Sequence, residues 1–123
     1  MNALPPYVAI VDDDQSVRRA LARLLDASSF NSRTYSSGVE FLNSLASALP
    51  ECLVVDFQMP EMNGFELCDE LVRAGVNIPT ILITAHDDKG CRERCRAAGA
   101  AFLLKPLDQA MLISAIDRAI GRG

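Results

Sequence analysis

Four short apolar runs without alternating polar residues constrain the fold of this chain most strongly. Each run has three to five residues, and they lie at 7–11, 52–55, 81–83 and 102–104. A strand with one face in water alternates apolar and polar residues, whereas a strand covered by helices on both faces does not need to alternate. A fifth, weaker strand is expected near 32–35. The runs therefore predict a parallel sheet that is buried on both faces.

Each predicted strand is followed by a helical pattern. Asp14 precedes a stripe of apolar residues spaced three or four apart, and it is expected to cap that helix. Ser37 and Glu40 form a capping-box pattern, after which apolar positions extend the predicted helix to Leu49. Three further helical patterns follow, at 63–75, 89–98 and 108–120. This alternation predicts an α/β fold, a doubly wound five-stranded parallel sheet with five helices.

Length and composition narrow the class of protein. The 123 residues suit one domain over 1–123, with its core at about 7–120. Half of the residues are hydrophobic, which excludes intrinsic disorder, and no apolar run approaches the roughly 20 residues of a membrane helix. The formal charge of −4 leaves no basic footprint for nucleic acid. We therefore expect a cytoplasmic domain that binds neither nucleic acid nor a membrane directly.

Chemically active side chains follow the predicted strands. Asp12 and Asp13 come after the first strand and Asp56 ends the third. Thr84 ends the fourth strand, and Lys105 follows the fifth. Because parallel strands end at the same edge of a sheet, where ligands of such folds bind, these side chains are expected to gather there. Taken singly, each has an ordinary structural explanation, so the argument depends on all of them together.

Three crowded aspartates must either take up protons or bind a cation. Oxygen ligands suit a hard divalent ion, Mg²⁺ or Mn²⁺. With the metal offsetting the charge, one carboxylate is free to attack phosphorus. The Thr84 hydroxyl and the Lys105 ammonium could then stabilise the phosphoryl oxygens. The pattern thus predicts a metal-dependent phosphoryl site.

The motifs resemble those of bacterial response-regulator receiver domains. They are IVDDD at 10–14, VDFQMP at 55–60 with MNG at 62–64, ITA at 83–85 and LKP at 104–106. The resemblance extends over about 7–120 and implies the flavodoxin-like receiver fold. The stretches 35–42 and 84–86 are similar to those of nitrogen-fixation and LuxR-type regulators. The resemblance implies a phosphorylation-dependent switch of a two-component system.

Roles for the acidic residues follow from this resemblance. Asp56 matches the phosphoacceptor, which receives its phosphoryl group from a histidine kinase or a phosphotransfer protein. Asp12 and Asp13 match the acidic pair that places Mg²⁺, with Asp13 and Asp56 as direct ligands. The backbone carbonyl of Gln58 matches a third protein ligand. Such a domain catalyses only its own phosphorylation and dephosphorylation and is not a turnover enzyme.

The resemblance also implies a switch. Thr84 matches the hydroxyl that moves toward the phosphoryl group, Lys105 the ammonium that pairs with it, and Phe102 the switch aromatic residue. Gln58 and His86 are candidates for tuning the lifetime of the phosphoryl group. The face formed by the fourth helix, fifth strand and fifth helix is expected to contact an effector or a second copy.

Two other functions were compatible with parts of the sequence. A phosphatase of the haloacid-dehalogenase type would use Asp12 as its nucleophile, but it would leave the loop after Asp56 unexplained. A non-phosphorylated adaptor would not need every key residue type that is present.

The fourth predicted helix is basic although the chain is acidic. Its cations are Lys89, Arg92, Arg94 and Arg96. Such charges usually lie on a solvated helix face, and a partner surface is the alternative.

Overall fold

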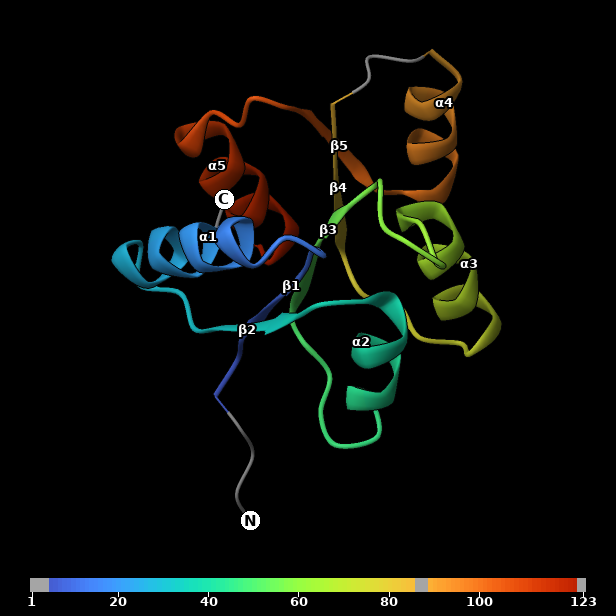
Figure 1. Cartoon of the computed structure of the whole chain (residues 1–123), viewed down its shortest axis with the longest axis horizontal. Helices are drawn as coiled ribbons and strands as arrows, with labels where there is room; N and C mark the ends of the chain where they lie inside the picture. Colours follow the sequence, from blue (N-terminus) through green and yellow to red (C-terminus); the bar gives the residue numbers. More distant parts are fainter. Residues whose placement is uncertain (1–4, 86–88, 122–123) are drawn as a thin grey trace.

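Five parallel strands form one sheet with the order β2-β1-β3-β4-β5 (Figure 1). The computed structural model describes residues 5–85 and 89–121. The strands are β1 (Val8–Val11), β2 (Ser32–Tyr35), β3 (Cys52–Asp56), β4 (Thr80–Thr84) and β5 (Ala101–Leu104). All four pairings between neighbouring strands are parallel. The predicted five-stranded parallel sheet is therefore confirmed, with β3 in its centre.

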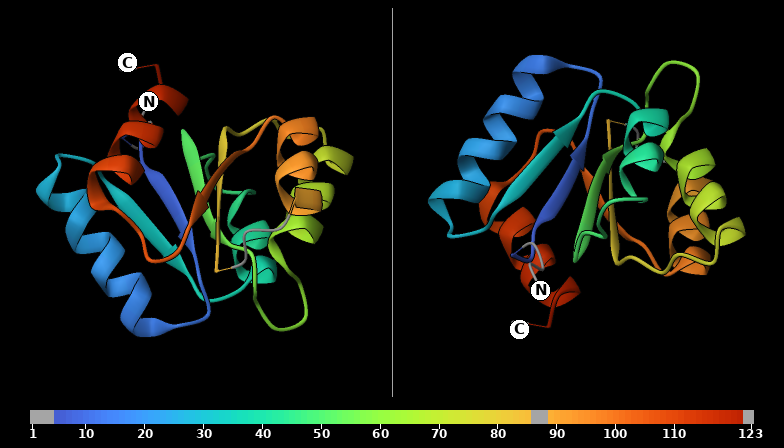
Figure 2. Two further views of the ribbon diagram at one scale, coloured as in Figure 1. Left: turned by 90° about the horizontal axis from the view of Figure 1, so that it is seen from above. Right: turned by 90° about the horizontal axis from the view of Figure 1, so that it is seen from below.

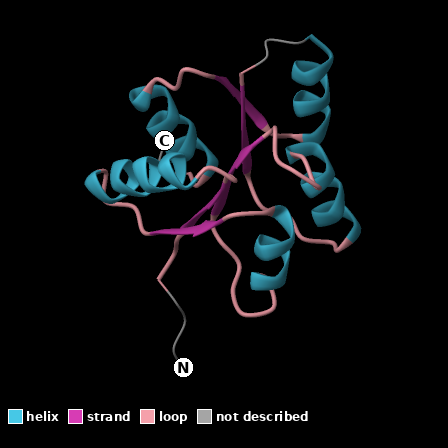
Figure 3. Cartoon of the chain, in the orientation of Figure 1, coloured by secondary structure: helices cyan, strands magenta, loops and turns pink. Residues whose placement is uncertain are grey.

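The helices form a layer on each face of this sheet. They are α1 (Gln15–Ala27), α2 (Gly38–Ser44), α3 (Gly64–Arg73), α4 (Lys89–Ala98) and α5 (Gln109–Ala119). Helices α1 and α5 cover one face, and α2, α3 and α4 cover the other (Figures 2 and 3). The doubly wound arrangement is also confirmed. None of the helices in the described part of the chain is long and apolar enough to cross a membrane.

Two apolar cores explain why the strand sequences do not alternate. In β1, Val8 and Ile10 pack toward α1 and α5, whereas Ala9 and Val11 pack toward α2 and α3. All four of these residues are at most 1% exposed. Successive side chains of a strand point to opposite faces of the sheet, and here helices cover both faces, so both sets of side chains are apolar.

The starts of four helices follow the sequence signals, among them α2, where Ser37 accepts a hydrogen bond from the Glu40 N–H, and the end of α2 departs from them. Asp14 caps α1, and Asn63 forms a full capping box with Glu66 at the start of α3. The prediction that α2 continues to Leu49 is wrong, because the helix ends at Ser44 and Leu49 is 60% exposed. Pro50 disfavours a helical conformation at Leu49, so a helix that includes this residue is unfavourable. Asp108 caps α5 as expected.

Gly64 allows the loop after β3 to lie close against the sheet. A Cβ atom at this position would lie 2.4 Å from Leu82 Cδ1 and 3.2 Å from Phe57 Cα. The Gly64 N–H also donates a hydrogen bond to the Phe57 carbonyl at 2.9 Å. Because a backbone atom cannot yield as a side-chain terminus can, glycine is required here by close packing. The loop that follows Asp56 is thereby held near the ends of the strands.

Candidate functional site

Three carboxylates meet at the carboxyl ends of β1 and β3. One oxygen of each of Asp12, Asp13 and Asp56 lies within 4.8 Å of the others. Asp12 and Asp56 are buried, at 4% and 6% exposure, whereas Asp13 is exposed. Strands β1 and β3 are paired up to Val11 and Val55, so the next residue of each strand reaches the same edge. The structure thus assembles the acidic cluster that strand-end geometry predicted.

Local hydrogen bonds fix the path of the chain at this edge. Asp12 Oδ1 accepts a hydrogen bond from the Asp14 N–H at 2.9 Å. The Asp12 carbonyl accepts one from Arg18 Nη1 on α1 at 2.8 Å. Asp14 in turn caps α1 by accepting from the Ser16 N–H. Asp14 therefore has a structural role, while Asp12 and Asp13 remain directed to the cluster.

Lys105 joins the cluster from the opposite side of β3. Its Nζ lies 3.0 Å from Asp56 Oδ1, and its backbone N–H donates to the Thr84 carbonyl at 2.8 Å. The second bond extends the pairing of β4 with β5 by one residue. The ammonium is thereby held beside the buried Asp56 carboxylate.

Burial and charge act against each other in the pKa values of the site. Burial raises the pKa of Asp56 above its ordinary value, although the hydrogen bond from Lys105 opposes this shift. Burial also raises the pKa of Asp12, and the nearby charge of Asp56 adds to the effect. Desolvation lowers the pKa of Lys105, but the Asp56 carboxylate outweighs it, so the pKa lies above its ordinary value. Lys105 is therefore a permanent cation beside an acid cluster that favours added positive charge.

The donor set fits a hard divalent cation. Carboxylate oxygens from two neighbouring strands converge, and one of the three groups is exposed to solvent. Such a cation keeps several waters and needs only a few carboxylates, so a cluster open on one side is suitable. Two of the carboxylates have pKa values raised by burial and by like charge, which a cation would offset.

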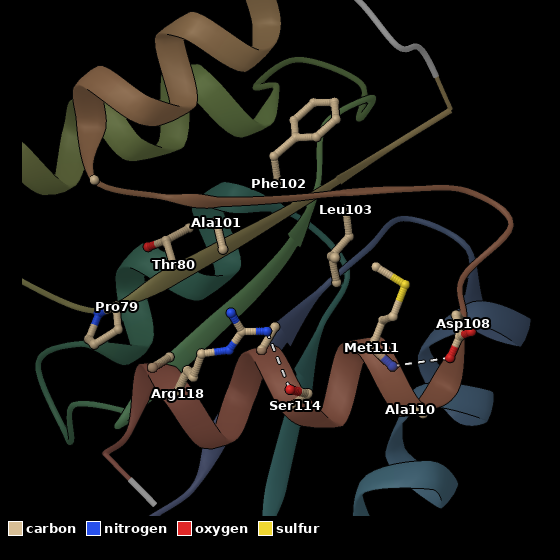
Figure 4. Close-up of a pocket in the computed structure, with 13 residues that line it drawn as sticks. Pro79, Thr80, Ala101, Phe102, Leu103, Asp108, Ala110, Met111, Ser114 and Arg118 are labelled. Carbon is tan, nitrogen blue, oxygen red and sulfur yellow. Dashed lines mark hydrogen bonds between the residues drawn. The ribbon is translucent and has the colours of Figure 1, made fainter. Parts of the chain in front are cut away.

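Thr84 and Phe102 occupy neighbouring strands on one face of the sheet. Leu82 pairs with Phe102 and Thr84 with Leu104, which places the side chains of Thr84 and Phe102 on the same face. Thr84 is 1% exposed, whereas Phe102 is partly buried. Figure 4 shows Phe102 on the opposite side of β5 from Leu103, which points toward α5. The two side chains therefore lie on the same side of neighbouring strands.

Two predicted residues are not tested by the geometry of the cluster. Gln58 lies in the loop that directly follows β3, and its side chain is exposed; the prediction concerns its backbone carbonyl. His86 lies outside the described residues.

Sequence reasoning missed two contacts made by the basic helix α4. The Arg92 guanidinium lies over the Phe102 ring, and the Arg94 guanidinium lies over the Phe65 ring. Both arginines are exposed, as expected for a solvated helix face, and each also lies over an aromatic ring. The spacing of Phe102 from Arg92 along the chain carries no periodic signal, so the sequence alone gave no indication of this contact.

Replacing Asp12 with Asn is expected to stabilise the metal-free domain at neutral pH. Because burial raises the Asp12 pKa, this carboxyl favours folding when protonated and opposes it when charged. Wild type should lose stability relative to Asp12→Asn as the pH rises through the folded-state pKa. We expect a melting temperature about 3–6 °C higher for the variant at about pH 7, which corresponds to about 1 kcal/mol.

This difference should shrink as the pH falls toward the ordinary pKa of 3.8. The amide oxygen of Asn can still accept the hydrogen bond from Asp14, so the loop is preserved. Thermal unfolding followed by circular dichroism in a chelator measures both values. A difference that stays constant with pH would contradict the assignment to the Asp12 charge.

Comparison with known proteins agrees with this geometry. The family model for the response regulator receiver domain matches residues 8–117. The transcriptional regulatory protein FixJ of Azorhizobium caulinodans is 36% identical over 122 residues, which cover 98% of this chain and 57% of that protein. FixJ of Rhizobium meliloti is 38% identical and covers 91% of this chain and 55% of its own length. The chain spans about half the length of these curated relatives.

Solved structures show the same similarity. The crystal structure of a response regulator receiver protein from Burkholderia phymatum is 45% identical, with a TM-score of 0.82 and coverage of 95% of this chain and 96% of that one. The crystal structure of FixJ-N is 35% identical, with a TM-score of 0.87 and 98% coverage of both chains. These matches do not favour a haloacid-dehalogenase-type phosphatase or a degenerate adaptor. The chain belongs to the response regulator receiver domain family, the phosphorylation-dependent switches of two-component systems.

Proposed function

We propose that Asp56 is the phosphoacceptor of this receiver domain. The observation that carries the proposal is the 3.0 Å contact between Lys105 Nζ and Asp56 Oδ1, beside two further carboxylates. Phosphorylation of an aspartate is general in this family. Asp56 is the member of the cluster that lies between the acidic pair on one side and the ammonium on the other.

Receiver domains bind Mg²⁺ at an acidic pocket, and the described cluster supplies such a pocket. Asp13 and Asp56 would hold Mg²⁺ or Mn²⁺ directly, with Asp12 supporting them and the backbone carbonyl of Gln58 as a further ligand. When bound, the cation neutralises charge on the carboxylates and on the incoming phosphoryl group. The exposed position of Asp13 leaves one side of the pocket open to solvent.

The transfer step uses groups that the strands already hold in place. A carboxylate oxygen of Asp56 forms a bond to phosphorus, and the bond between phosphorus and the donor's leaving atom breaks with its electron pair going to that atom. Lys105 stabilises the negative charge on the phosphoryl oxygens, and the Thr84 hydroxyl donates to one of them. Hydrolysis removes the phosphoryl group: water attacks phosphorus, the bond from phosphorus to the Asp56 oxygen breaks, and Asp56 leaves as the carboxylate. The chain thus catalyses only reactions of its own side chain.

Receiver domains interact with histidine kinases or phosphotransfer proteins, and we propose one of these as the donor. The output would be read on the face of α4, β5 and α5 by an effector or a second copy. A groove of about 660 Å³ lies beside β5 on this face, lined by Leu103, Met111 and Arg118 among others (Figure 4). Met111 is 58% exposed there, which provides an apolar surface for contact. Phosphorylation would shift the population between two arrangements of this face.

The test is phosphoryl uptake from acetyl phosphate, followed by intact-mass spectrometry. With Mg²⁺ the wild-type chain should gain one phosphoryl group, about 80 Da. With excess chelator the gain should be lost, because uncompensated carboxylates repel the anionic donor. No gain with Mg²⁺, either from acetyl phosphate or from a panel of histidine kinases, would contradict the proposed function.

A further inference from the structure

Helix α4 is fastened to the domain by few buried side chains. Only Cys91 and Cys95 of Lys89–Ala98 are buried, and both are short. Burying their short side chains removes little apolar area from water, so contacts made by neighbouring residues of α4 also contribute to positioning the helix. Two arginines flank this buried pair, and each lies over an aromatic ring.

The two arginine contacts join α4 to α3 and to β5. Arg94 Cζ lies 4.1 Å from the centroid of Phe65, which packs edge-on against Phe57 at 5.1 Å. Phe57 directly follows Asp56. On the other side, Arg92 Cζ lies 5.1 Å from the centroid of Phe102. The rotation of α4 about its axis is thus fixed by Cys91 and Cys95 inside and by the two arginines outside.

Arg92 contacts Phe102, the residue that matches the switch aromatic residue of receiver domains. Phe102 is only partly buried at the edge of the core, and the Arg92 guanidinium lies over its ring. Cation–π contacts at exposed sites stabilise the observed arrangement modestly, by an amount that corresponds to about two- to five-fold in population. Any movement of the ring away from α4 loses this contact.

We propose that Arg92 is a positioning residue that holds Phe102 against α4 and thereby opposes the switch. This inference rests on the proposed function of Thr84 and Phe102. Movement of Thr84 toward a phosphoryl group on Asp56 opens space on the face of the sheet that Thr84 and Phe102 share. Phe102 fills that space by turning away from Arg92. Loss of Arg92 therefore makes the switched arrangement more accessible.

Three variants separate this role from a general effect of charge. Arg92→Met keeps a long side chain but removes the cation, and Arg92→Lys restores the charge. Arg96→Met makes the same charge change at another exposed position of the helix, and among the described residues no aromatic contact is recorded for Arg96. Each protein is compared by NMR of labelled phenylalanine rings without donor, and by its rate of phosphoryl uptake from acetyl phosphate with Mg²⁺.

We expect Arg92→Met to shift the Phe102 ring resonances and to raise the uptake rate about two- to five-fold, while Arg96→Met changes neither. Arg92→Lys should lie nearer wild type. The proposal is overturned when Arg92→Met matches Arg96→Met in both its ring resonances and its uptake rate. It is also overturned when Arg92→Met takes up the phosphoryl group more slowly than wild type, or when its Phe102 resonances shift while the uptake rate stays unchanged. A wild-type chain that takes up no phosphoryl group from acetyl phosphate or from a panel of histidine kinases would instead refute the proposed function, and the ring measurement would still report on the Arg92 contact.

Discussion

Asp56→Asn is expected to take up no phosphoryl group under conditions in which the wild-type chain gains one. The amide is nearly the same size and can keep a polar contact at this position, but its nitrogen and oxygen are poor nucleophiles toward phosphorus. Asp56 is 6% exposed, so an apolar substitution would disturb a buried site more than Asn does. The rate should fall by at least about 10³-fold, as for other removed nucleophiles. Intact-mass spectrometry after incubation with acetyl phosphate and Mg²⁺ measures it.

Asp12→Asn is the matched control, because it removes a charge from the same cluster without removing the proposed acceptor. It should still gain one phosphoryl group, although more slowly if metal binding is weakened. A gain in Asp56→Asn would place the nucleophile elsewhere, and Asp12 would be examined first because it is the other buried carboxylate of the cluster. Peptide mapping of the phosphorylated chain distinguishes these sites.

Lys105→Met should slow phosphoryl transfer to Asp56 by about 10²- to 10³-fold. The Lys105 ammonium lies 3.0 Å from Asp56 Oδ1, within reach of a phosphoryl oxygen bound to that carboxylate. Its pKa is raised by Asp56, so the charge is present throughout the neutral range. Methionine has a similar length and no charge, so the variant removes mainly the electrostatic contribution. The time course of phosphoryl uptake at saturating Mg²⁺ gives the rate.

Lys105→Arg tests whether charge alone is sufficient. It keeps the cation but presents a planar, wider group, and we expect an intermediate rate. Thermal unfolding of each variant shows whether the domain remains folded at the assay temperature. A rate for Lys105→Met within about three-fold of wild type would exclude Lys105 from a direct role in phosphoryl binding.

The sequence predicted the fold and the acidic cluster well, for a common physical reason. Continuous apolar runs predict strands covered on both faces, and parallel strands end at one edge, so Asp12 and Asp56 were expected at the same edge. That β1 and β3 are adjacent is shown by the structure. The end of α2 was less predictable, since the apolar spacing through Leu49 favours a helix that Pro50 disfavours. Leu49 is exposed as a result.

Contacts between side chains from distant segments were beyond the sequence. The position of Arg92 over Phe102 depends on how α4 is rotated against β5, with Cys91 and Cys95 facing inward, and the sequence does not specify that rotation. The ion pair between Lys105 and Asp56 likewise depends on the path of the chain after β5. The residue types indicated the chemistry of the site, whereas the distances between its side chains are known only from the structure.

The central place of β3 separates the two tasks of the site. The acidic pair reaches Asp56 from β1, on one side, whereas Thr84 and Lys105 come from β4 and the end of β5, on the other. With the roles proposed above, substitutions near β1 would alter metal affinity, whereas substitutions near β4 and β5 would alter the residues that transmit the signal. The cation requirement and the downstream partner could then be changed separately by design, with the proposed acceptor strand between them left the same.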